Sequence, residues 1–257
     1  MKKLALPVFV AISALVLSGS SAFGAEGKPV SYKSGDETVQ GVLYTPAGKG
    51  PFPALIVIHE WWGLNDWIKD QGSKLADQGY ESLAVDLYRG KVATTPDMAH
   101  ELMRGVPEDR AKRDLHAAFE FLQSQPSVKK DRIGASGWCM GGEQSLLLSL
   151  ADPRVKATAI FYGPLVTDPD RLKSLQGPVL GIFGNDDKGP SPTDVEKFRQ
   201  GLSAAGKTDV TIYQYDGVGH AFASPSADKL GLYNPDKAQE AWAKCWQWLD
   251  DKLLIKK

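Results

Sequence analysis

Apolar, strand-like runs alternate with helical patterns along almost the whole chain, and this alternation restricts the fold more than any other feature. Strand-like runs occupy residues 38–44, 54–58, 82–85, 132–136, 157–162, 179–183 and 210–215. Helical patterns occupy residues 70–78, 145–150, 193–205 and 235–254, and a further helix is expected to begin at Pro107. Such alternation predicts an α/β fold with a mostly parallel central sheet and helices on both faces.

The first 24 residues have the pattern of an export signal. Lys2 and Lys3 precede an apolar run at residues 4–17, and small residues then lead to a plausible cleavage site before Ala25. The apolar run is shorter than the roughly 20 residues of a membrane-spanning helix. We therefore expect residues 1–24 to be a cleaved signal peptide. Residues 25–257 would form a single exported domain, located in the periplasm if the source is a bacterium.

Charge and cysteine content exclude several classes of function. The whole chain has 30 basic and 31 acidic residues, and this balance predicts neither a nucleic-acid partner nor, after signal cleavage, a membrane partner. The only cysteines are Cys139 and Cys245, too few for a disulfide scaffold. Cys245 lies on the apolar face of the last helical pattern and is expected in the core. The oligomeric state is not predicted.

The run from Gly137 to Gly142 (Gly-Trp-Cys-Met-Gly-Gly) lies between a strand-like run and a helical pattern. A glycine two residues on either side of a nucleophile is typical of a nucleophile elbow, a strained strand-to-helix turn. Cys139 occupies the nucleophile position. A buried cysteine in a tight turn is the alternative interpretation of this run alone.

Other reactive side chains also follow strand-like runs. Glu60 follows residues 54–58, Asp186 and Asp187 follow residues 179–183, and His220 follows residues 210–215. Parallel strands present such positions at one edge of the sheet, where ligands bind. A cysteine needs a base to become a nucleophilic thiolate, and histidine oriented by an aspartate supplies one. Each residue alone has a structural explanation, but together and in this order they favour catalysis.

The chain resembles the dienelactone hydrolases, a family of α/β-hydrolases with a cysteine nucleophile. The resemblance extends from about Val42 to Leu249 and rests on five segments, at residues 59–65, 85–88, 137–142, 184–187 and 219–222. It implies an α/β-hydrolase fold and a carboxylic ester or lactone hydrolase that needs no cofactor.

The resemblance also implies roles for individual residues. Cys139 would be the nucleophile, His220 the base, Asp187 rather than Asp186 the orienting acid, and Glu60 a carboxylate that helps to activate the cysteine. Backbone N–H groups of Trp61 and Met140 would form the oxyanion hole. The pair His59-Glu60 also occurs in zinc motifs, but Gly63 occupies the place of the second histidine, so no metal is expected.

Two departures from the family pattern concern the substrate. Family members that cleave dienelactone hold its carboxylate with two arginines; here Arg89 is shifted by one position and Ser224 replaces the other. The loss of a bidentate clamp predicts that neutral substrates are preferred to anionic ones. An aromatic pocket is expected from side chains near strand ends, with Arg89 and Ser224 beside it: Trp61, Trp62, Tyr88, Trp138, Tyr162 and Phe222.

These patterns predict an exported hydrolase that cleaves an ester, lactone or thioester of a small molecule through an acyl-cysteine intermediate. Two alternatives stay open at this point. One is a hydrolase-like protein that binds a ligand or partner without turnover. The other is a periplasmic redox thiol protein, which the absence of a Cys-x-x-Cys pair disfavours.

Overall fold

The structure is a computed structural model that describes residues 24–254. The expected signal peptide lies outside this range except for its last residue, Gly24. Eight strands form one sheet: β1 (Gly27–Ser34), β2 (Glu37–Tyr44), β3 (Phe52–Ile58), β4 (Glu81–Asp86), β5 (Val128–Trp138), β6 (Thr158–Phe161), β7 (Val179–Gly184) and β8 (Val210–Tyr215).

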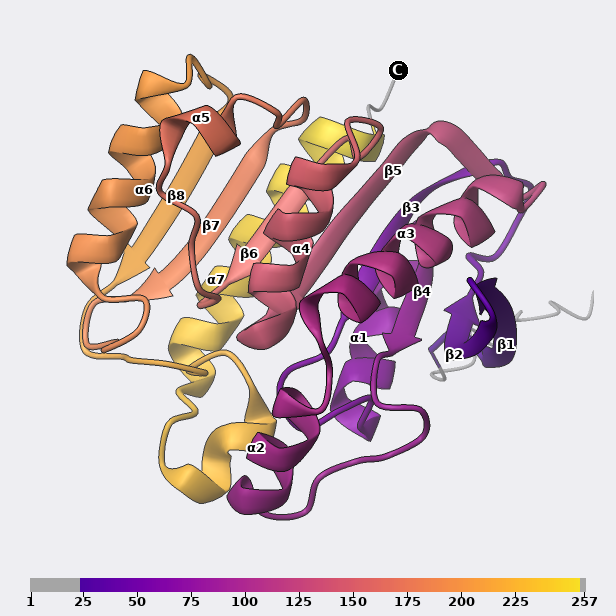
Figure 1. The fold of residues 1–257 in the computed structure, drawn as a ribbon, viewed down its shortest axis with the longest axis horizontal. Helices are drawn as coiled ribbons and strands as arrows, with labels where there is room; N and C mark the ends of the chain where they lie inside the picture. Colours follow the sequence, from indigo (N-terminus) through magenta and orange to yellow (C-terminus); the bar gives the residue numbers. More distant parts are fainter. Residues whose placement is uncertain (1–23, 255–257) are drawn as a thin grey trace, which may run out of the picture.

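The strands are arranged in the order β1-β2-β4-β3-β5-β6-β7-β8. Strand β2 pairs antiparallel with both β1 and β4, whereas every pairing from β4 to β8 is parallel. The predicted mostly parallel sheet is therefore confirmed. Its parallel strands all end at the same edge, where the site residues follow them (Figure 1).

Helices cover both faces of the sheet, as predicted. The helical segments are α1 (Asp66–Asp77), α2 (Pro96–Arg104), α3 (Glu108–Ser124), α4 (Met140–Ala151), α5 (Pro169–Leu172), α6 (Pro192–Ala204), η1 (Pro225–Leu230), α7 (Pro235–Leu249) and η2 (Asp250–Leu254). In β3, Leu55 and Val57 pack with α1 and α7, while Ile56 and Ile58 pack with α3 and α4. The continuous apolar run thus serves two cores, because successive side chains of a strand point to opposite faces (Figure 1).

Several elements differ from the sequence-based expectation. Strand β1 was not predicted, because half of its positions are exposed at the sheet edge and it carries no apolar run. Helix α1 begins four residues earlier than expected, where the Asn65 side chain accepts the Ile68 N–H at 3.0 Å. Helix α4 begins at Met140, directly after Cys139, rather than at Ser145. The segment 87–105 contains α2, which no helical pattern predicted.

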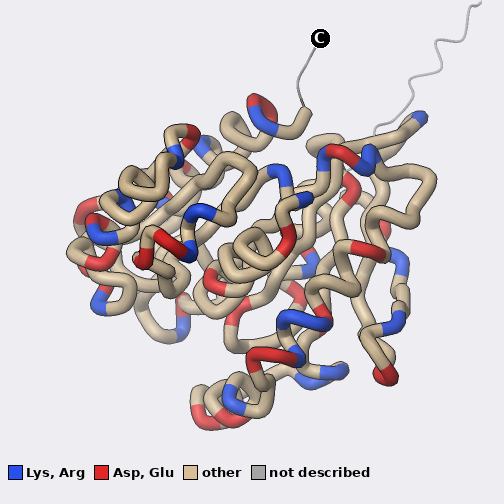
Figure 2. The backbone as a smooth tube through the Cα atoms, turned by 45° about the horizontal axis from the view of Figure 1, so that its top comes forward, with Lys and Arg blue, Asp and Glu red and all other residues tan. Residues whose placement is uncertain are grey.

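Charged residues of both signs are interspersed over the backbone (Figure 2). This distribution agrees with the balanced composition of the chain. Within residues 24–254, no helix has both the length and the apolar character needed to cross a membrane.

Candidate active site

Cys139 lies in the sharp turn between β5 and α4, with φ of 54° and ψ of −120°. A positive φ is unfavourable for any residue with a side chain, so the surrounding structure must hold this conformation. The Cys139 N–H donates to the Phe161 carbonyl at 2.9 Å. A Cβ atom at Gly141 would lie 2.2 Å from the Ile58 carbonyl oxygen, and one at Gly137 would lie 2.2 Å from the Gly141 carbonyl oxygen. The glycines of the motif are therefore required by close backbone packing.

The structure brings His220 and Asp187 together from the loops after β8 and β7. His220 Nδ1 lies 2.9 Å from Asp187 Oδ2, and the Asp187 side chain is 2% exposed. Its other oxygen accepts the Gly189 N–H at 2.9 Å, which holds the carboxylate in place. Asp186 is exposed, so the adjacent aspartates have different surroundings and only Asp187 faces the imidazole.

Cys139 is within hydrogen-bonding reach of His220, and both side chains are half-buried. Burial alone lowers the pKa of the His220 imidazole. The hydrogen bonds to Asp187 and Cys139, and the charges of these two groups, outweigh burial and raise the pKa to about 10. The ring thus retains its proton at neutral pH and can donate a hydrogen bond toward the sulfur of Cys139.

Glu60, which follows β3, is buried at the same edge of the sheet. The Ser224 hydroxyl donates to Glu60 Oε2 at 2.9 Å, and the Tyr162 hydroxyl lies 3.4 Å from Oε1. Burial raises the pKa of this carboxyl to about 7, against the opposing effects of Ser224, His220 and Tyr162. Tyr162 has a φ of 39°, and its ring packs edge-on against His220 at 5.3 Å. Ser224 therefore holds the Glu60 carboxylate, and Tyr162 contacts both this carboxylate and the His220 imidazole.

Two cavities meet at Cys139 and His220. The cavity of about 250 Å³, here called the apolar cavity, is bounded by α2, η1 and the segment after β3: Glu60, Trp61, Trp62, His100, Met103, Cys139, His220, Ala221, Ala227, Leu230 and Leu232. The second, of about 370 Å³ and here called the acidic cavity, lies over α3 and α4: Leu87, Met103, Val106, Glu108, Ala111, Cys139, Met140, Glu143, Gln144, Leu147, Pro164, Gly189 and His220. The sulfur thus has space on two sides for the two groups that flank a scissile bond.

The two residues expected to provide the oxyanion hole lie at the start of α4 and in the turn after β3. Met140 is the first residue of α4, where the backbone N–H has no carbonyl partner within the helix. Trp61 belongs to the turn after β3 and lines the apolar cavity. The Tyr88 hydroxyl lies 3.1 Å from the Trp61 carbonyl and 3.4 Å from Met140 Sδ, so it links the two segments rather than facing a ligand.

Six residues expected at the substrate pocket line neither cavity: Tyr88, Arg89, Trp138, Tyr162, Phe222 and Ser224. Trp138 and Phe222 are fully buried in the core and line neither cavity. Trp138 packs against Trp67, Phe161 and Trp242, because alternate residues of β5 face the α1–α7 layer. Ser224 contacts Glu60 instead of facing a cavity. Trp62, by contrast, lines the apolar cavity, as expected.

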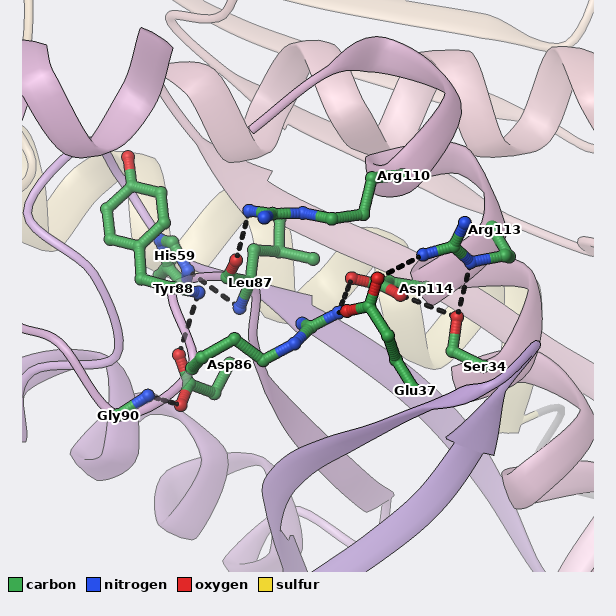
Figure 3. A network of polar contacts seen from close by, with 11 residues as sticks. Ser34, Glu37, His59, Asp86, Leu87, Tyr88, Gly90, Arg110, Arg113 and Asp114 are labelled. Carbon is green, nitrogen blue, oxygen red and sulfur yellow. Dashed lines mark hydrogen bonds and ion pairs between the residues drawn. The ribbon is translucent and has the colours of Figure 1, made fainter. Parts of the chain in front are cut away.

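Arg89, also expected at the pocket, points to the opposite side of its loop. Its guanidinium pairs with Glu37 at 2.7 Å and with the buried Asp114 at 2.8 Å (Figure 3). Asp86 accepts the N–H groups of Tyr88, at 2.9 Å, and of Gly90 in the same loop. These contacts give Arg89 a structural role, joining the loop after β4 to the β1–β2 hairpin and α3.

His59 was not among the expected site residues, although it supports one of them. Its Nδ1 donates to the Glu60 carbonyl at 2.6 Å and its Nε2 accepts the Leu87 N–H at 3.3 Å. Burial lowers the pKa of the His59 imidazole, so the ring is neutral and can serve as both donor and acceptor. The sequence signal was the adjacent pair His59-Glu60, but only the structure shows that the histidine also holds the backbone of Leu87 (Figure 3).

One group of side chains in the described part of the chain has the spacing of metal ligands. It consists of His116, Glu120 and Asp152, whose ligand atoms lie within 4.8 Å of one another. The Arg154 guanidinium donates to both carboxylates, at 2.6 Å in each case. The guanidinium thus neutralises the carboxylates that a metal ion would need. None of these residues lines either cavity.

Comparisons with known proteins agree with this architecture. Residues 39–253 match the model of the dienelactone hydrolase family. A protein of Methylorubrum extorquens named "Putative carboxymethylenebutenolidase" is 34% identical over 79% of this chain and 73% of its own length. A "Putative Dienelactone Hydrolase" of Klebsiella pneumoniae subsp. pneumoniae is 28% identical, with a TM-score of 0.77 over 88% of this chain and 99% of that chain.

A dienelactone hydrolase-like promiscuous phosphotriesterase from metagenomic libraries has the same fold. It superimposes with a TM-score of 0.82 over 90% of this chain and 99% of that chain, at 24% identity. The fold and the sequence therefore lead to the same conclusion: the chain belongs to the dienelactone hydrolase family, a family of hydrolases with the α/β-hydrolase fold.

Proposed function

We propose that this protein hydrolyses ester, lactone or thioester bonds of small molecules through an acyl-cysteine intermediate on Cys139. One observation carries the proposal. A cysteine with a positive φ lies at the junction of two cavities, within hydrogen-bonding reach of a histidine that is itself 2.9 Å from a buried aspartate. This arrangement matches the nucleophile, base and orienting acid of acyl transfer.

In the first half of the reaction, the Cys139 thiolate attacks the carbonyl carbon. The carbonyl oxygen becomes an oxyanion, which accepts hydrogen bonds from the N–H groups of Trp61 and Met140 in this proposal. When the intermediate collapses, the bond to the leaving group breaks and the leaving alcohol or thiol takes a proton from His220. The acyl group then remains on the sulfur.

The second half returns the enzyme to its starting state. His220 takes a proton from a water molecule, whose oxygen attacks the thioester carbonyl. Collapse of this second intermediate breaks the carbon–sulfur bond, releasing the carboxylic acid and restoring the thiolate beside the imidazolium. Asp187 keeps the ring oriented through both halves, and no cofactor takes part.

Neutral substrates are favoured over anionic ones by the surroundings of the sulfur. No lysine or arginine of the described chain lines either cavity, and Arg89 is held by Glu37 and Asp114. A carboxylate bound there would lose its hydration without gaining a cationic partner. We therefore expect neutral esters to have a higher kcat/KM than esters of similar size that carry a carboxylate.

The decisive experiment is mass spectrometry of the protein after brief mixing with 4-nitrophenyl acetate. We expect an acetyl adduct on Cys139, and a loss of kcat/KM of at least about a thousandfold in Cys139→Ala and His220→Ala. Cys245→Ala, which alters only a buried core thiol, serves as the control and retains the adduct. An unmodified protein would indicate a non-catalytic binder, and a stably oxidised sulfur would indicate a redox thiol protein.

A further inference from the structure

The acidic cavity contains two carboxylates beside the candidate nucleophile. Glu108 is the first residue of α3, and Glu143 lies in the first turn of α4, four residues after Cys139. Both line the same cavity as Cys139 and His220. No reaction step described above uses either carboxylate, so their effect on the substrate is a separate question.

Neither carboxylate has a hydrogen bond or an ion pair with a side chain in residues 24–254. Lys112, one turn further along α3, lines the adjacent groove with Glu108 but not this cavity. Burial, and secondarily the charge of Glu108, raises the pKa of the Glu143 carboxyl. The first turn of a helix stabilises negative charge, which lets both carboxylates remain without a cationic partner.

The remaining walls of the acidic cavity are mainly apolar, formed by Leu87, Met103, Val106, Leu147 and Pro164. A metal ion would need oxygen or nitrogen ligands on all sides, which these walls do not provide. An alkylated ammonium group combines a positive charge with an apolar surface. It therefore satisfies the carboxylates and the walls together.

We propose that Glu108 and Glu143 determine substrate specificity by selecting esters or thioesters that carry a cationic, alkyl-substituted ammonium group on one side of the scissile bond. This inference rests on the proposed hydrolytic function and specifies its substrate class. The ammonium group would occupy the acidic cavity, while the group on the other side of the bond would occupy the apolar cavity.

The test compares two thioesters that differ only in charge: acetylthiocholine and its neutral isostere, S-(3,3-dimethylbutyl) thioacetate. For the wild-type protein we expect kcat/KM to be about tenfold higher for the cationic thioester at low ionic strength. Glu143→Gln and Glu108→Gln should each lower this ratio about threefold, with the larger effect at the more buried Glu143. Added salt should lower the wild-type ratio as well, because it screens the attraction.

Glu101→Gln provides a matched control, since Glu101 is an exposed glutamate of α2 that lines neither cavity. This variant should retain the wild-type ratio. If Glu143→Gln disturbs α4, as its thermal unfolding would show, Glu108→Gln at the exposed start of α3 still provides the test.

The possible outcomes separate this inference from the function on which it depends. Hydrolysis of both thioesters at equal rates, or a ratio that neither glutamine variant changes, would overturn the inference and leave the acyl-cysteine mechanism intact. If neither thioester is hydrolysed and Cys139 acquires no acyl group, both proposals are wrong.

Discussion

The Glu60 side chain shows how burial changes the chemistry of a single residue. An exposed glutamate is ionised above about pH 4.5, whereas burial raises the pKa of Glu60 to about 7. The folded protein consequently keeps a proton at pH 5 to 7 that the unfolded chain has already lost. The free energy of unfolding should therefore fall as the pH rises through this interval.

Replacement of Glu60 by glutamine should remove this pH-dependent loss. Between pH 5 and pH 8, the free energy of unfolding of Glu60→Gln minus that of the wild type should increase by about 3 kcal/mol. Urea unfolding of both proteins at the two pH values measures the change. Glu101→Gln controls for the loss of an exposed charge, and parallel stability curves for wild type and Glu60→Gln would contradict the raised pKa.

At the level of elements, the strand–turn–helix unit of β5 and α4 holds Cys139 in its unfavourable conformation. A Cβ atom at Gly141 would overlap the Ile58 and His59 carbonyls, so α4 packs directly on the end of β3. This contact is between backbone atoms, which cannot move aside as a side chain can.

We expect Gly141→Ala to destabilise the protein by about 3 kcal/mol or more, because its Cβ would overlap the Ile58 carbonyl oxygen. Thermal unfolding measures the loss. Gly189→Ala is the comparison, since a Cβ atom there meets no atom within 4 Å. Wild-type stability in Gly141→Ala would show that the elbow is more loosely packed than described.

The loop after β4 depends on a second set of contacts between elements. Arg89 links this loop to β2 through Glu37, the first residue of that strand, and to α3 through Asp114, whose side chain is fully buried. A buried carboxylate that loses its cationic partner is strongly destabilising.

Arg89→Ala should therefore lower the free energy of unfolding by about 3 kcal/mol, while the relative activity on anionic and neutral esters stays unchanged. Arg113→Ala, which removes an arginine paired with the exposed Glu37, should cost less than about 1 kcal/mol. A selective loss of activity on anionic esters in Arg89→Ala would instead place this side chain in substrate recognition.

At the scale of the whole molecule, export remains a prediction. The contacts of Ala25 bear on where the mature protein would begin. The Ala25 N–H donates to Asp77 Oδ1 at 3.1 Å, and the Ser73 hydroxyl donates to the Ala25 carbonyl at 2.9 Å. Residue 25 therefore contacts α1, and the folded part of the chain can begin at the expected cleavage site. Cleavage would place a positively charged amino group beside Asp77.

When the full chain is expressed in a bacterium with a periplasm, we expect the periplasmic fraction to contain a protein that begins at Ala25. Intact-mass analysis and N-terminal sequencing identify the first residue. A variant with Lys2 and Lys3 replaced by glutamate should remain uncleaved, because export signals require a basic start. Full-length wild-type protein in the cytoplasm would contradict the prediction.

Sequence patterns were sufficient for the fold class, the family and the candidate nucleophile. Apolar runs and helical spacing are local patterns and can be recognised in the sequence. The glycines on either side of Cys139 likewise predict a tight backbone turn at that residue. The same patterns did not distinguish the neighbouring residues Tyr88 and Arg89 or Trp138 and Cys139 by the direction of their side chains. The structure shows that, of these four residues, only Cys139 lines the cavities.

By itself, therefore, the sequence determined which residues follow the strands and so reach one edge of the sheet. Only the tertiary structure decided that Trp138 packs in the core, that Ser224 bonds to Glu60, and that Glu108 and Glu143 share a cavity with Cys139. The physical reason is that the spacing of apolar residues depends only on residues close together in the chain. These contacts, by contrast, join side chains from loops and helices far apart in the chain. Their distances depend on how the layers pack.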